Sequence, residues 1–140
     1  LVTRAQVLYD DDCGFCRWLL AKIVRWDVES VLEPVSLRSS RAAELLSEID
    51  ERVRLSSWHL VQPDGSVLSG GSAIAPLLDY LTRRRLRFFL IGAKIARSAP
   101  RTTEKLYGFV ARNRHRFGRW LGEEACAVDP TEVAGRRMKP

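Results

Sequence analysis

The stretch that decides the fold reads Gln6-Val7-Leu8-Tyr9-Asp10-Asp11-Asp12-Cys13-Gly14-Phe15-Cys16. Its short, mostly apolar start ends in three aspartates, which is typical of a buried strand that stops at Asp10. From Cys16 onward, apolar residues recur every three or four positions through Val24, which predicts an amphipathic helix with Asp12 as its N-cap. The sequence therefore places a Cys-x-x-Cys pair in the turn between a strand and a helix.

Strands and helices alternate through the rest of the first 82 residues. We expect a strand over 31–35, where Pro34 indicates a sheet edge, and a helix that begins at Ser39 or Ser40 and continues to Ile49. The turn Gln62-Pro63-Asp64-Gly65 predicts a hairpin between 58–61 and 66–69, and a helix follows it. The order β-α-β-α-β-β-α predicts an α/β fold whose first two strands are parallel.

Beyond residue 82 the sequence predicts only helices, over 86–96 and 102–117. The tail from Asp129 contains two prolines and a glycine and is expected to be a loop. We therefore divide the chain into an α/β core over 1–82, appended basic helices over 83–128 that pack on the core, and a loop tail over 129–140. A length of 140 residues fits one domain overall.

The positive charge is confined to one block. Residues 1–80 hold 8 Lys and Arg against 12 Asp and Glu, whereas residues 81–120 hold 12 against 1, and the whole chain carries a net charge of +6. A basic appendage of this kind suggests three alternatives. It binds nucleic acid, it lies on an anionic membrane, or its arginines form a solvated face of helices that pack on the core. No nucleic-acid module is recognisable, which argues against the first. Leu86-Arg87-Phe88-Phe89-Leu90-Ile91 beside three arginines keeps peripheral membrane contact open.

No targeting segment or membrane-spanning run is visible in the sequence. Three cysteines are too few for a disulfide-stapled secreted scaffold, and their number is odd. We therefore expect a soluble protein in a reducing compartment, the cytoplasm.

The Cys-x-x-Cys spacing predicts thiol-disulfide exchange. A sulfur at a helix N-terminus lies near unpaired backbone N–H groups and the positive end of the helix dipole, which favour a thiolate. Cys13, expected to be exposed there, is the predicted nucleophile toward a disulfide of a protein or a small molecule, and Cys16 is the predicted resolving cysteine. The electron donor that would restore the dithiol is not named by the sequence.

Two alternatives use the cysteines differently. They could hold a metal if Cys126 joined them with His59 or His115, or they could be inert core residues. A third possibility comes from Gly14-Phe15, which resembles the Cys-Gly-Phe-Ser of monothiol glutaredoxins that hold iron–sulfur clusters. The prediction adopted here is a redox pair without cofactor or metal, and the alternative is a non-catalytic binding module.

The three aspartates and the helix terminus have opposite effects on the stability of a Cys13 thiolate. A nearby carboxylate disfavours a Cys13 thiolate by about 1–2 kcal/mol, whereas the helix dipole favours it by about 0.3–1 kcal/mol. These contributions nearly cancel, so we expect no strongly lowered pKa at Cys13, and a reductant rather than a strong oxidant. Asp10 is either the base that deprotonates Cys16 or a turn residue.

The segment Tyr9–Cys16 resembles the Asp-x-x-Cys-x-x-Cys signature of the DCC family of thiol-disulfide oxidoreductases. The resemblance continues through Asp64-Gly65, Gly71-Ser72-Ala73, Pro100, Tyr107 to Arg114, Phe117-Gly118, Cys126 and Pro130, so it covers nearly the whole chain. It implies a thioredoxin-like fold with appended C-terminal helices, disulfide oxidoreductase activity at Cys13 and Cys16, and Asp10 as the signature acid. Arg112-Asn113-Arg114 matches the family and is expected to form ion pairs with the acidic front, as structure rather than chemistry.

Two departures bear on the site. The family usually has glycine where this chain has Asp11, which raises the question of a positive φ there. Thioredoxins place a cis-proline before the third strand, and this chain has Ser56 and Ser57 there instead, so a serine hydroxyl or backbone group is expected to contact the substrate. Phe15 and Trp18 complete the predicted substrate-binding residues as an apolar docking surface.

Overall fold

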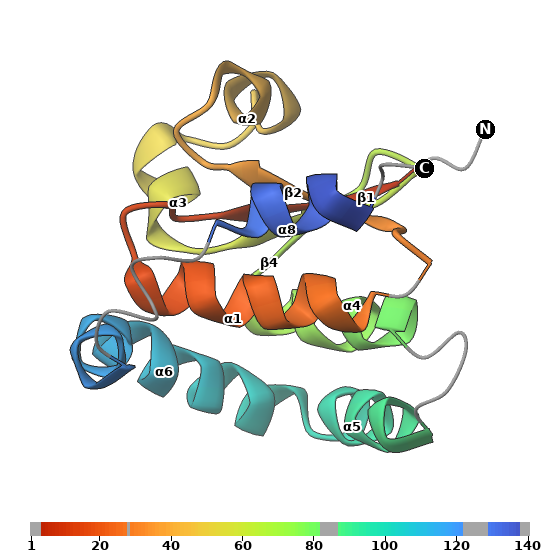
Figure 1. The fold of residues 1–140 in the computed structure, drawn as a ribbon. Helices are drawn as coiled ribbons and strands as arrows, with labels where there is room; N and C mark the ends of the chain where they lie inside the picture. The colour runs from red at the N-terminus through yellow and green to blue at the C-terminus, as the bar shows by residue number, and fades with distance from the viewer. Residues whose placement is uncertain (1–3, 28, 82–86, 122–128, 138–140) are drawn as a thin grey trace.

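A computed structural model describes residues 4–27, 29–81, 87–121 and 129–137 (Figure 1). Four strands form one mixed sheet in the order β2-β1-β3-β4. Their bounds are β1 Ala5–Tyr9, β2 Leu32–Ser36, β3 His59–Val61 and β4 Val67–Ser69. β1 and β2 are parallel, as expected, whereas β3 is antiparallel to both of its neighbours. The arrangement is thioredoxin-like, which confirms the expected fold class.

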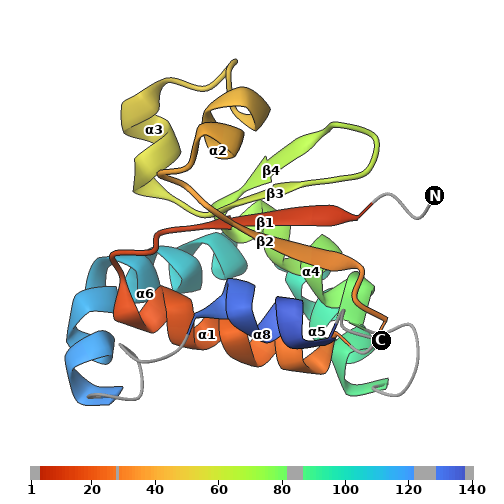
Figure 2. The ribbon, with the colours of Figure 1, turned by 45° about the horizontal axis from the view of Figure 1, so that its top comes forward.

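Helices cover both faces of the sheet (Figures 1 and 2). α1, α4 and α8 lie on one face, α2 and α3 lie on the other, and α5 and α6 form an outer layer beyond α1 and α4. The bounds are α1 Gly14–Trp26, α2 Ser40–Leu45, α3 Glu51–Ser56, α4 Ile74–Leu81, α5 Arg87–Ser98, α6 Pro100–Leu121 and α8 Pro130–Arg137, and a 3-10 turn η1, Gly70–Ala73, leads into α4.

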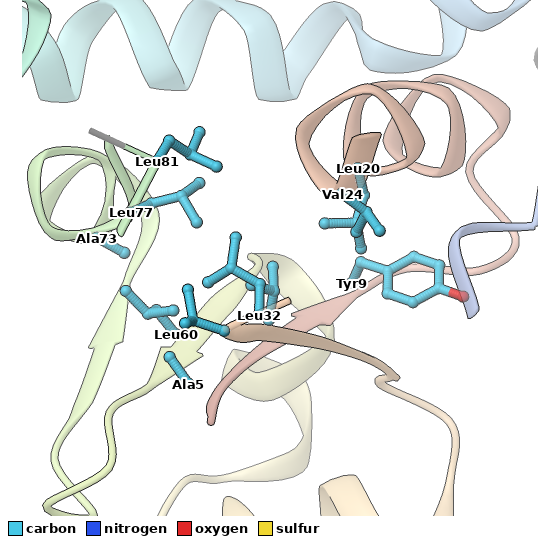
Figure 3. Packing of buried hydrophobic residues seen from close by; sticks show 11 residues of the cluster. Ala5, Tyr9, Leu20, Val24, Leu32, Leu60, Ala73, Leu77 and Leu81 are labelled. Carbon is cyan, nitrogen blue, oxygen red and sulfur yellow. The ribbon is translucent and has the colours of Figure 1, made fainter. Parts of the chain in front are cut away.

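The alternation of side chains along β1 divides the core between the two faces of the sheet. Ala5, Val7 and Tyr9 pack in the cluster that faces α1 and α4, whereas Leu8 packs in the cluster that faces α2. Figure 3 shows the first cluster, in which side chains of α1 and α4 point toward those of the strands: Leu20, Val24, Leu77 and Leu81 toward Tyr9, Leu32 and Leu60. A strand buried on both sides explains why the run before Asp10 is almost continuously apolar.

Several local expectations are confirmed. The 62–65 turn joins β3 to β4, with Gly65 at φ 86°, a conformation that glycine adopts without strain. Pro34 lies in β2, which is an edge strand with β1 as its one neighbour in the sheet. Ser39 is the N-cap of α2, where its hydroxyl accepts a hydrogen bond from Ala42 N–H at 3.2 Å.

The helix expected from Ser39 or Ser40 to Ile49 is wrong in its extent. α2 ends at Leu45, and a second short helix, α3, begins at Glu51. Asp50 caps α3 by accepting the Arg52 N–H at 2.9 Å. Asp50 therefore starts the second helix, and the apolar residues that continue at helical spacing to Ile49 hid the end of α2 at Leu45.

The loop expected over 129–140 is also wrong, because residues 130–137 form α8. Asp129 precedes this helix, and its carboxylate accepts the Thr131 N–H at 2.9 Å. Pro130 is buried, and Val133 and Ala134 pack on the main cluster against α1 and β2. The prolines of the tail were taken to break a helix. A proline at the first helical position, such as Pro130, is instead typical of a helix start.

Gly71 marks the closest approach between η1 and α6. A Cβ at this position would lie 3.0 Å from Glu104 Cα and overlap the Glu104 carboxylate. We expect Gly71→Ala to lower the free energy of unfolding by about 1–3 kcal/mol, because α6 must move away from the core. Urea unfolding measures this change.

Gly135→Ala in α8 is the matched control for this substitution. A Cβ there meets no atom within 4 Å, and alanine in a helix is expected to be neutral or to stabilise by about 0.5–1 kcal/mol. Equal unfolding midpoints for the two variants would show that η1 and α6 are not packed as described.

Candidate active site

The Cys-x-x-Cys pair lies at the start of α1, directly after the turn that follows β1. Cys13 itself is the N-cap of α1, since its sulfur accepts the Cys16 backbone N–H at 3.3 Å. The predicted cap, Asp12, is therefore wrong by one residue. Asp12 instead closes the preceding turn by donating its backbone N–H to Asp10 Oδ1 at 3.1 Å.

The two sulfurs are in direct contact as free thiols. Cys16 S–H donates to Cys13 Sγ at 2.7 Å. Cys13 is 1% exposed, and Cys16 is partly exposed. The expectation of an exposed Cys13 is wrong, because α6 packs against the same end of α1 and adds a layer that the local sequence did not show.

The environment separates the pKa values of the two thiols. The pKa of Cys13 falls to about 6, chiefly because its sulfur accepts the Cys16 S–H, with help from the Cys16 backbone N–H and the charge of Arg114; burial and Asp10 act in the opposite direction. The pKa of Cys16 is raised well above its ordinary value by the hydrogen bond that it donates, by burial and by the Cys13 charge. The predicted cancellation at Cys13 is therefore wrong, since it weighed only the aspartates and the helix terminus.

Two arginines balance the aspartates of the turn. Arg38, which follows β2, reaches Asp12 at 2.8 Å and lies 3.6 Å from Asp11 and 3.8 Å from Asp10. Arg114 of α6 reaches Asp10 Oδ2 at 3.4 Å. The expected ion pair between Arg114 and the acidic front is confirmed. No hydrogen bond between the Asp10 carboxylate and Cys16 is found in the described part of the chain, so its role as a base stays a prediction.

The predicted docking residues Phe15 and Trp18 form an aromatic group with Phe117 of α6. Phe15 stacks on Trp18 with ring centroids 6.3 Å apart and packs against Phe117 at 5.5 Å. Lys22 lies over the Trp18 ring at 5.7 Å. Phe15 and Phe117 join α1 to α6, and because all three rings are half-buried they leave apolar surface beside the thiols.

Ser56 and Ser57, the other predicted substrate contacts, differ in their surroundings. Ser56 is exposed at the end of α3, and its hydroxyl donates to Val53 O at 2.7 Å. The Ser57 hydroxyl lies 2.9 Å from Tyr107 Oη on α6. The Ser57 hydroxyl is thus engaged by α6, and contact of either serine with a substrate stays a prediction.

The backbone at Asp11 needs no left-handed conformation. Among the residues described, the only non-glycine with positive φ is Ser30, at 54°. An aspartate is therefore accommodated at the position where the family usually has glycine.

The residues named for a metal site do not gather around the thiols. His59 is buried in β3, 2.6 Å from Ser69 Oγ and 2.9 Å from Arg54 O, and burial lowers its pKa. His115 is exposed on α6, and Cys126 lies outside the described residues. Within the described ranges, no three His, Cys, Asp or Glu side chains come together as a metal site.

Of the segment named for membrane contact, Leu86 and the three arginines before it lie outside the described ranges, and 87–91 form the start of α5. None of the helices described is both long and apolar enough to cross a membrane. Peripheral membrane contact and a cytoplasmic location stay predictions.

Comparison with known families settles which group of proteins this is. The sequence matches the family described as DCC1-like thiol-disulfide oxidoreductase over residues 7–120. The chain belongs to this family. No curated protein and no solved structure matched it. The match extends almost to the end of α6, so in this DCC1-like oxidoreductase the helix that supplies Arg114 and Phe117 falls within the family's own region.

Sequence reasoning missed both of these α6 contributions to the site. Arg114 was expected only to hold the structure together, and Phe117 was named only among the residues that resemble the family. Tyr107, Arg114 and Gly118 recur at intervals of seven and four, which puts them on one face of a helix. This signal identifies a buried face, but it does not say which part of the core that face meets.

Proposed function

We propose that this protein is a dithiol oxidoreductase that reduces a disulfide of a protein or a small molecule, with Cys13 as nucleophile and Cys16 as resolving cysteine. The observation that carries the proposal is the asymmetric thiol pair, in which Cys13 receives two hydrogen bonds from Cys16. An accepting sulfur with a pKa of about 6 is largely a thiolate at neutral pH, and the thiolate is the form that attacks disulfides.

The exchange proceeds in two balanced steps. The Cys13 thiolate attacks one substrate sulfur, a bond forms between them, and the other substrate sulfur leaves as a thiolate. The Cys16 thiolate then attacks Cys13, the Cys13–Cys16 disulfide forms, and the first substrate sulfur leaves. The substrate gains two electrons, the protein loses two, and the released thiolates take up the two protons. A dithiol from outside must reduce the protein again.

The coupling of the two thiols also controls their order. The largest cause of the raised pKa at Cys16 is the hydrogen bond to Cys13, and the Cys13 charge adds to it. Both causes disappear once Cys13 is bonded to the substrate sulfur. Cys16 then ionises more easily, with Asp10, whose charge acts on both thiols, as the proposed acceptor of its proton. The resolving cysteine is thus held inactive until it is needed.

Access to Cys13 requires local movement, because its side chain is buried. The Phe15, Trp18 and Phe117 rings are the half-buried apolar surface next to it and the proposed docking area for an apolar part of the substrate. Cys16 is the more exposed thiol, so the assignment of the nucleophile rests on thiolate character rather than exposure.

The reduction of insulin by dithiothreitol tests this proposal. We expect the protein to shorten the lag before insulin precipitates, and to turn over many times. The matched sample is the same protein with its cysteines alkylated and its fold checked by circular dichroism. Equal lag times for native protein, alkylated protein and dithiothreitol alone would reject dithiol activity.

A further inference from the structure

α6 is held on the core at points that flank the thiols. Near its start, Tyr107 contacts Ser57, and near its end Phe117 and Gly118 lie against Phe15, with a Cβ at Gly118 only 3.4 Å from Phe15 N. Arg114 lies between these contacts on the same face of the helix. Its side chain is therefore directed to the core and is 23% exposed, although it belongs to the most basic part of the chain.

The Arg114 guanidinium reaches the loop that carries Cys13. Arg114 Nη2 lies 3.4 Å from Asp10 Oδ2, and the Asp10 carboxylate is 14% exposed. The Asp10 carbonyl accepts the Cys13 N–H at 3.3 Å, so this acid and the nucleophile share one turn. Charges in such a partly buried place interact more strongly than charges in water.

Other charged groups also face this turn. Asp11 and Asp12 lie in it, Arg38 approaches from the residues after β2, and Cys16 is the ionisable neighbour on α1. From the start of α8, Asp129 acts on Tyr9 rather than on the thiols. Arg38 is 50% exposed and pairs with all three aspartates, whereas Arg114 is 23% exposed and, among the residues described, pairs with the Asp10 carboxylate. Arg114 is thus the less solvated of the two cations.

We propose that Arg114 is a positioning residue of the redox reaction: from α6 it holds a positive charge beside Asp10 and thereby stabilises Cys13 as a thiolate. This inference rests on the proposed function of the thiol pair. The redox centre is then formed by residues of both the thioredoxin-like core and α6. Asp10 opposes the thiolate, and Arg114 offsets that opposition, so the two residues have opposite effects on Cys13.

The same charge acts on the redox equilibrium. Cys13 is a thiolate in the reduced protein. It is also the leaving group when a reducing partner, joined to Cys13 in a mixed disulfide, completes the reduction. The thiolate does not exist in the Cys13–Cys16 disulfide. Arg114 therefore favours the reduced form and makes the oxidised protein a stronger oxidant. Without it, the pair shifts toward a reductant.

The test measures the reactivity of Cys13 without requiring turnover. The rate of alkylation by iodoacetamide is followed from pH 4 to 9 in the reduced protein, and the modified cysteine is located by mass spectrometry. We expect Arg114→Gln to raise the midpoint of the Cys13 profile by about one pH unit and Asp10→Asn to lower it by roughly half a unit to one unit. Arg114→Lys, which keeps the charge, is expected to restore at least half of the shift.

Arg112→Gln is the matched control, because Arg112 is exposed on the same helix. It is expected to leave the midpoint unchanged. A loosened fold would move Arg114→Gln and Asp10→Asn in the same direction, so opposite shifts identify an effect of charge. An unchanged midpoint in Arg114→Gln overturns the inference. Failure of the wild-type protein in the insulin assay would instead reject the proposed function, whatever the alkylation profiles show.

Discussion

Cys13→Ser is expected to lose at least about a thousandfold in the rate of disulfide reduction, because a serine hydroxyl does not attack a disulfide at neutral pH. Cys16→Ser is expected to fail differently. Its Cys13 still carries out the first attack, but without a resolving thiol the reaction stops at a mixed disulfide. The two variants change the N-cap of α1 and a residue of its first turn, and both should fold alike, so their difference reports the order of the chemical steps.

The measurement combines turnover with trapping. Both variants are assayed with insulin, and each is then mixed with oxidised glutathione, separated from excess reagent and analysed by mass spectrometry. We expect a stable glutathione adduct on Cys13 in Cys16→Ser and none on Cys16 in Cys13→Ser. The reverse pattern would assign the nucleophile to Cys16, the more exposed thiol, and would show that exposure outweighs thiolate character here.

The stability of the reduced protein should depend strongly on pH. The pKa of Cys13 is about 6 in the folded protein and close to 8.5 in an unfolded chain. Between these values the unfolded state binds more protons, so stability rises with pH, and it is lost as pH falls through 6. We expect a gain of roughly 2–4 kcal/mol from pH 5 to 8.5. Above that range the raised pKa of Cys16 reverses the slope, because only the unfolded chain then loses this proton.

Urea unfolding under a phosphine reductant measures this dependence. The reference is Cys13→Ala/Cys16→Ala, in which both thiols are absent and all other titrating groups remain. Cys16→Ala alone separates the causes: it removes the S–H donor but keeps the backbone N–H, so the pKa of Cys13 is expected to rise toward its ordinary range and most of the pH dependence to disappear. Parallel curves for wild type and the double variant would contradict a stabilised thiolate.

A lowered pKa at Cys13 makes the pair a weaker reductant than the sequence alone suggested. The sequence suggested a reductant because no group was known to stabilise the reduced form. In the structure, Cys16 and Arg114 both lower the pKa of Cys13, which favours the reduced form and so raises the reduction potential of the pair. Equilibration with glutathione buffers would measure this shift directly.

Local patterns predicted most of the thioredoxin-like core. The apolar run before Asp10, the 62–65 turn and Pro34 each specify a feature through near neighbours in the chain, and each is found as expected. The errors also have local causes. Apolar residues continue at helical spacing to Ile49, which hid the end of α2 at Leu45, and Pro130 starts α8 where a proline was taken to indicate a loop.

The sequence alone determined the Cys-x-x-Cys pair and its place between a strand and a helix, since a spacing of three residues brings two sulfurs together on one helical turn. Only the tertiary structure decided how that pair is tuned. The burial of Cys13 and the charge of Arg114 depend on where α6 packs, about a hundred residues along the chain from the thiols. An electrostatic effect depends on distance in space, and a helix pattern shows which face is buried but not what that face meets.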